Sequence, residues 1–144
     1  MKSDPFHLQR FVEAQEPVYA QVCAELRQGR KNSHWMWFFF PQIRGLGHSP
    51  AAQYYAISGQ QEAAAYLRHP VLGARLQECT QLVNAVEGRT VEDIFGYPDD
   101  LKFRSSMTLF AQAAPEEEIF RLALEKYFDG QRDERTLELL PERL

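Results

Sequence analysis

Cysteine is scarce in this 144-residue chain, and the two that it has, Cys23 and Cys79, lie far apart. Their separation fits no spacing of metal ligands. The first residues, MKSDPFHLQRF, contain no apolar stretch of the kind that a secretory signal needs. We therefore expect two reduced thiols, no disulfide, no metal site and a cytoplasmic location.

Long apolar runs and β-branched residues are also in short supply. No run approaches the roughly 18 apolar residues that cross a membrane, so we expect no membrane partner. Valine, isoleucine and threonine total 15 residues, whereas leucine and alanine total 30. This balance favours helices over sheets, and no segment shows the alternating pattern of a strand.

Proline and glycine divide the chain into helical segments. Amphipathic stretches directly follow six prolines, and each proline predicts a helix start at its own position. These prolines are Pro5, Pro17, Pro50, Pro70, Pro98 and Pro115. Helix ends are predicted at Gly29, Gly88 and Gly130. We predict a single compact all-α domain over residues 1–144, with about eight helices and short connections.

Polar residues predict local contacts within these helices. Ser58 and Thr90 each begin a sequence with the spacing of a capping box. Asp100 and Arg104 are four residues apart, which predicts a weak ion pair on an exposed helix face.

Carboxylates are absent between Glu25 and Glu62, although four cationic residues fall there. From Glu87 onward the chain has 14 acidic and 8 basic residues. We therefore expect a locally positive region and a negative C-terminal half. The net charge of −4 makes nucleic acid an unlikely partner.

Five aromatic residues lie within WMWFFF, from Trp35 to Phe40, inside the carboxylate-free segment. The run has no β-branched residue, so we predict a short helix that Ser33 caps and that ends at Phe40, before Pro41. The three phenylalanines are predicted to be core. Trp35 and Trp37 leave two alternatives open: burial, or a rim position where an indole stacks on a flat ligand.

Two further segments have alternative interpretations. In QIRGLGHSP, the glycines before a helix start fit either an anion-binding turn or a plain tight turn between helices. In KFRSS, Ser105 could donate to an anion, and Ser106 fits close helix packing. A nucleophilic serine is not indicated, because no G-x-S-x-G turn is present.

These features suggest one hypothesis about function. A pocket would lie where the carboxylate-free segment meets the KFRSS helix, and its ligand would be small, anionic and partly planar, such as a nucleotide or a phosphorylated metabolite. Whether the protein is an enzyme stays open, and no cofactor is indicated. The candidate ligand-binding residues are Arg30, Lys31, His34, Trp35, Trp37, Arg44, His48, Lys102, Arg104 and Ser105.

An alternative hypothesis involves no chemistry. The basic segment and the acidic C-terminal half would be complementary surfaces for a protein partner or for a homo-oligomer. A groove for single-stranded nucleic acid ranks third, because aromatic and basic residues alternate but the net charge opposes it.

The blocks SHWMWFFFPQ, AQYYAI and DDLKFRSSMTLFA, within a match from about Asp4 to Leu140, closely resemble a bacterial family of unknown function. Its members are sometimes labelled calpastatin. That label does not suit this chain, because such inhibitors are long, disordered and repetitive, whereas this sequence is short and periodic. The resemblance implies a compact multihelical fold and no established activity.

Overall fold

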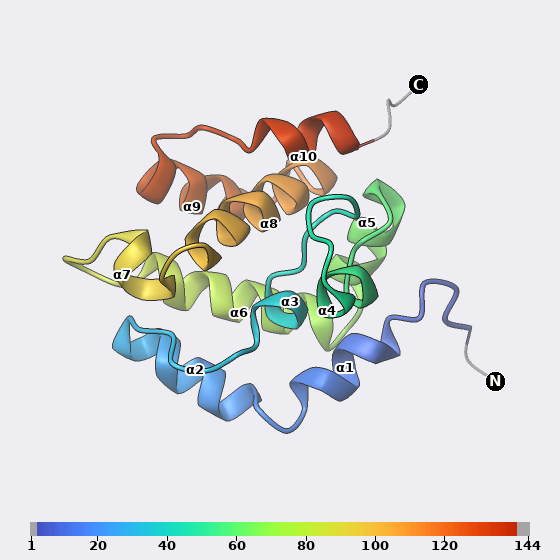
Figure 1. The fold of residues 1–144 in the computed structure, drawn as a ribbon, viewed down its shortest axis with the longest axis horizontal. Coiled ribbons are helices and arrows are strands. Elements are labelled where there is room, and N and C mark those ends of the chain that lie inside the picture. Colours follow the sequence, from blue (N-terminus) through green and yellow to red (C-terminus); the bar gives the residue numbers. More distant parts are fainter. Residues whose placement is uncertain (1–2, 141–144) are drawn as a thin grey trace.

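The computed structural model describes residues 3–140, and this part of the chain contains ten helices (Figure 1). They are α1 (Gln9–Gln15), α2 (Tyr19–Gln28), α3 (Met36–Phe39), α4 (Pro50–Tyr54), α5 (Gln60–Arg68), α6 (Leu72–Asn84), α7 (Val91–Phe95), α8 (Asp99–Ala113), α9 (Glu118–Phe128) and α10 (Glu134–Leu139). Within residues 3–140, the β-structure is limited to an isolated bridge between Ile43 and Ile57. The all-α prediction is confirmed, with helices of one turn added to the expected number.

Helix α8 lies in the middle of the fold (Figure 1). It packs against α5, α7, α9 and α10, while α6 packs against α2, α5 and α9. Phe103, Met107 and Phe110 of α8 are all fully buried. These residues lie at positions i, i+4 and i+7 of the amphipathic stretch predicted after Pro98, and burial of this apolar face fixes α8 at the centre.

The aromatic run from Trp35 to Phe40 packs into the same core as α8. Phe39 and Phe40 are buried, and Phe38 is half-buried against the core, which confirms the prediction for these phenylalanines. The ring of Phe40 lies edge-on to Phe103, with 5.1 Å between centroids. Such edge-to-face contacts add stability beyond the burial of area alone.

The helix starts differ from the prediction at most prolines. Only Pro50 occupies the first turn of its helix. Pro98 stands at the N-cap position of α8, and the remaining prolines lie in the turns that lead into their helices. Proline fixes φ equally well for a turn, so it marked the approach to each helix rather than its first residue.

The predicted caps have mixed outcomes. Thr90 makes the predicted capping box at α7. The prediction for Ser58 is wrong, because Gly59 is the N-cap of α5 and the Ser58 hydroxyl donates to Glu62 at 2.8 Å. Ser33 does not cap α3 either, because its hydroxyl donates to Glu25 at 2.7 Å. In both wrong cases a buried carboxylate competes for the hydroxyl.

A buried ion pair joins Arg10 of α1 to Glu62 of α5, with 2.9 Å between Nη2 and Oε2. The Arg10 guanidinium also donates to four backbone carbonyls, those of Phe6, His7, Tyr54 and Ala56. The other Glu62 oxygen accepts from the Ser58 amide and hydroxyl. This saturated cluster fixes the N-terminal turn against the segment before α5, and the sequence analysis did not predict it.

Cys23 and Cys79 are both buried free thiols, as expected. Burial raises the pKa of the Cys79 thiol well above its usual range. Across residues 3–140, helices that combine the length and the apolar character needed to cross a bilayer are absent.

Candidate functional site

A groove of about 450 Å³ lies between the loop before α4 and the first half of α8. We call it the main groove. Trp37, His48, Lys102 and Ser105 line it, so four of the ten candidate residues come together there. Its position is the predicted junction of the carboxylate-free segment with the KFRSS helix. Its volume is typical of small-molecule sites, which span about 300–1,000 Å³.

One side of the main groove pairs an aromatic ring with a cation. The Lys102 ammonium lies 4.6 Å from the centroid of the half-buried Trp37 ring. The same ammonium lies 3.1 Å from Asp99 Oδ1, while Lys31 lies 2.9 Å from Asp99 Oδ2. Two ammonium groups therefore share one carboxylate, and the trio keeps a net positive charge.

The lining of the main groove also includes a carboxylate, Asp133, that was not among the candidate residues. Asp133 Oδ2 accepts hydrogen bonds from the Ser105 hydroxyl at 3.1 Å and from the Thr136 amide at 3.0 Å. Within residues 3–140, no donor reaches its second oxygen, Oδ1. Asp133 is the N-cap of α10. Its spacing to Thr136 could have predicted the cap, but not its place in the groove.

The loop before α4 owes its shape to its two glycines. Gly45 has a φ of +108°, which disfavours any side chain, and it packs on Leu139 of α10. A Cβ placed on Gly47 would lie only 2.6 Å from the Cβ of Ala52. Ser49 caps α4 through a hydrogen bond to the Ala52 amide at 3.1 Å. Close packing thus accounts for the glycines, which favours the tight-turn interpretation.

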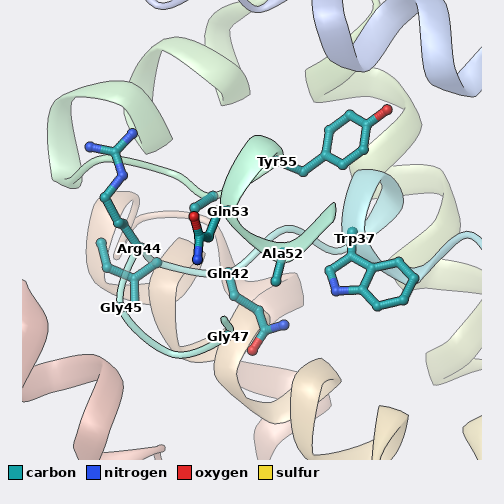
Figure 2. A pocket seen from close by; sticks show the side chains of 10 residues that line it. Trp37, Gln42, Arg44, Gly45, Gly47, Ala52, Gln53 and Tyr55 are labelled. Carbon is teal, nitrogen blue, oxygen red and sulfur yellow. The ribbon is translucent and has the colours of Figure 1, made fainter. Parts of the chain in front are cut away.

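A small enclosed pocket of about 20 Å³ lies under this loop (Figure 2). Trp37 and Arg44 stand at opposite ends of it, with Ala52 and Gln53 between them (Figure 2). Arg44 is exposed and does not line the main groove. Arg44 therefore shares this small pocket with Trp37, but it does not meet the other candidate residues of the main groove.

Three other candidates have structural partners outside the main groove. Trp35 is only 1% exposed, and its indole N–H donates to Glu25 Oε1 at 2.9 Å. Lys31 binds Asp99, as described above. Arg104 donates to the carbonyls of Gln131 and Arg132, both at 3.0 Å.

The predicted ion pair between Asp100 and Arg104 is wrong, because Arg104 binds two backbone carbonyls instead. Arg104 does not bind Asp100, which is buried. The carbonyls of the connection between α9 and α10 hold the guanidinium instead. Arg30 and His34 are exposed and do not line the main groove.

The local positive charge is smaller in space than along the sequence. Glu25, from α2, accepts five hydrogen bonds from Gln21, Asn32, Ser33 and Trp35. Burial alone would raise the pKa of this carboxyl, but the hydrogen bonds outweigh burial and hold the pKa at about 2. Glu25 and Asp99 thus bring negative charge to a segment that has none of its own.

The main groove is equipped for binding rather than for an evident reaction. The single hydrogen of the Ser105 hydroxyl has two acceptors within reach, Asp133 Oδ2 and the Leu101 carbonyl, and within residues 3–140 the hydroxyl has no histidine partner. No group of three or more His, Cys, Asp or Glu residues in that range is arranged to hold a metal ion. The groove can offer a ring face, an ammonium and a carboxylate oxygen to a bound molecule.

The fold and groove define a small all-α protein with one contiguous apolar core and a groove of mixed polar and apolar lining at its surface. The chain belongs to the family described as protein of unknown function (DUF1810), whose model matches residues 5–140. The crystal structure of the conserved hypothetical protein Rv1873 from Mycobacterium tuberculosis is similar, with a TM-score of 0.95 and 59% sequence identity. That match covers 97% of this chain and 100% of the other. No curated protein matches. The family resemblance noted in the sequence is thus confirmed.

Proposed function

We propose that the main groove binds a small, partly planar ligand that carries an anionic group. The observation that supports this most directly is the Lys102 ammonium 4.6 Å from the Trp37 ring centroid, at the wall of a groove of about 450 Å³. A flat ring that stacks on Trp37 would bring its anionic substituent within reach of Lys102. Nucleotides and phosphorylated metabolites are ligands of this kind.

The arrangement around Asp99 allows the Lys102 ammonium to bind a ligand anion with little loss of free energy. When Lys102 turns to a ligand anion, Asp99 keeps its second partner, Lys31, at 2.9 Å. Asp99 is then not left unpaired. An unpaired carboxylate beside the ligand anion would oppose binding. Lys102 is therefore the residue in this trio that can exchange partners.

Asp133, which also lines the main groove, would bind a different group of the ligand. Asp133 Oδ1 can accept a hydrogen bond from a hydroxyl or an amino group of the ligand. The Ser105 hydroxyl holds the carboxylate in place through Oδ2 at 3.1 Å. The proposed ligand thus has an anionic end and a hydrogen-bond donor, with a ring between them.

Calorimetry and a thermal-shift screen test this proposal with adenosine monophosphate, phosphosugars and dicarboxylates as probes. A ligand at 100 times its dissociation constant adds about 2.7 kcal/mol to the stability of the folded state. We expect adenosine monophosphate to stabilise the protein and to quench Trp37 fluorescence. Lys102→Gln should remove the stabilisation.

Arg30→Gln is the matched control, because Arg30 is an exposed cation outside the main groove. It should leave binding unchanged. An equal loss of binding in both variants would show that Lys102 acts only through long-range electrostatic attraction. A flat response to every probe, with a molecular mass that rises with protein concentration, would favour the self-association module instead.

A further inference from the structure

A second groove, of about 410 Å³, lies between the N-terminal turn and the segment that connects α4 to α5. Its lining includes His7, Arg10, Arg44, Tyr54 and Glu62. It shares no lining residue with the main groove. An inference about the second groove therefore does not rest on the proposed function of the main groove.

The floor of the second groove is rigid and chemically closed. The guanidinium donors of Arg10 are already hydrogen-bonded to Glu62 and to four backbone carbonyls. Both Glu62 oxygens are occupied, one by Arg10 and the other by Ser58. The floor therefore fixes the shape of the groove and offers a ligand neither a free donor nor a free acceptor.

One wall of the second groove is held in a backbone conformation that few residues adopt. His7 has a φ of +54°, in the left-handed region. Arg10 stabilises this turn by donating to the carbonyls of Phe6 at 2.6 Å and His7 at 2.8 Å. Such conformations persist where the surroundings enforce them, and they cluster at binding sites.

Three side chains that line the second groove can donate hydrogen bonds to a ligand: Arg44, Tyr54 and His7. The Arg44 guanidinium has no hydrogen-bond or ion-pair partner among residues 3–140, although a backbone bond to Ile57 at 2.8 Å fixes its position in the chain. Tyr54 is 53% exposed, and its ring lies edge-on to His7 with 6.3 Å between centroids. A cation, a phenol and an imidazole thus face a space whose only carboxylate is already paired.

We propose that the second groove is an oxyanion-binding site, in which Arg44 binds the carboxylate or phosphate group of a small ligand. Arginine suits this task because its planar fork matches both groups in a bidentate way. His7 and Tyr54 add hydrogen bonds and a ring face on the opposite wall. The ligand must carry hydrogen-bond acceptors, because the Arg44 guanidinium can only donate.

Two-dimensional NMR on the full chain tests the site, with inorganic phosphate and benzoate as separate probes. We expect the amide signals of residues 6, 7, 44 and 53–58 to move. Arg44→Gln should weaken the affinity of the better probe at least fivefold. The tighter probe identifies whether phosphate or carboxylate is preferred.

Two controls separate this site from the main groove and from general attraction. Arg30→Gln and Lys102→Gln should each leave the ligand-induced shifts of residues 6, 7 and 53–58 unchanged. The proposal fails if neither probe moves these signals, if Arg44→Gln has no effect, or if Arg30→Gln weakens binding as much. Arg44 is exposed, so unchanged circular dichroism should show that Arg44→Gln still folds.

Discussion

The indole N–H of Trp35 donates to Glu25 Oε1 at 2.9 Å, and this bond joins the start of the aromatic run to α2. The tryptophan is buried because its one polar group is satisfied there. The carboxylate, in turn, tolerates burial because five donors surround it. Each group makes the burial of the other possible.

The stability of the protein should depend on pH through Glu25. Its pKa is about 2 in the folded state, against an ordinary value of 4.5. Because the pKa is lowered in the folded state, the contribution of Glu25 to the free energy of unfolding is complete above pH 4.5. It is lost as the pH falls toward 2. The shift corresponds to about 3 kcal/mol. Urea unfolding at pH 7, 4 and 3 measures this effect. The free energy of unfolding should fall less between pH 7 and pH 3 in Glu25→Gln than in the wild type.

Glu138→Gln is the control for this experiment, because Glu138 makes only an exposed ion pair with Arg135. Its acid loss should match that of the wild type. A parallel acid loss in Glu25→Gln and the wild type would show that the hydrogen bonds to Glu25 do not stabilise the fold.

Breaking the buried pair of α1 and α5 should be costly. Arg10→Met leaves Glu62 buried without its cation, and we expect a loss of about 3–5 kcal/mol in the free energy of unfolding. Arg121→Met breaks an exposed pair with Glu125 and should cost no more than about 1 kcal/mol. Chemical denaturation measures both, and similar losses would contradict a special role for Arg10.

Gly47→Ala should destabilise the loop that borders the main groove. The added methyl group would meet the Cβ of Ala52 at 2.6 Å, so the loop or α4 must shift, at a cost of about 1–3 kcal/mol. Ala52→Gly removes the obstacle, so the double variant should lose less than the sum of the single variants. Thermal unfolding measures the three losses of stability. If the loss in the double variant equals the sum of the two single losses, the contact with Ala52 is not the cause of the destabilisation by Gly47→Ala.

Arg104→Met should loosen the connection between α9 and α10. Its guanidinium donates to the carbonyls of Gln131 and Arg132, and both bonds disappear in this variant. We expect hydrogen exchange at residues 131–136 to rise about tenfold, which is a change of about 1.4 kcal/mol. Lys102→Met is the control, because Lys102 binds Asp99 instead. Equal exchange in both variants would refute the anchoring role of Arg104.

Sequence patterns predicted the helices because they are local. The spacing of Phe103, Met107 and Phe110 revealed the buried face of α8, and Thr90 revealed the start of α7. Both signals arise from residues within a few positions of each other. Periodicity and capping depend on just such short separations.

Partners across long separations explain what the sequence could not predict. Arg10 and Glu62 are 52 residues apart, and Ser105 and Asp133 are 28 apart. No local spacing links such residues. The segment without carboxylates was correctly described, yet Glu25 and Asp99 enter it from other helices. Its charge was therefore overestimated, and ten candidates were assigned to one pocket where the structure groups four.

Helix α10 contributes one buried residue, Thr136, yet it touches both walls of the main groove. Asp133 at its start binds Ser105 of α8, and Leu139 near its end packs on Gly45 of the opposite loop. These two contacts make α10 a short brace beside the main groove, near the end of the described chain. A change in this brace alters the shape of the groove without touching the aromatic core.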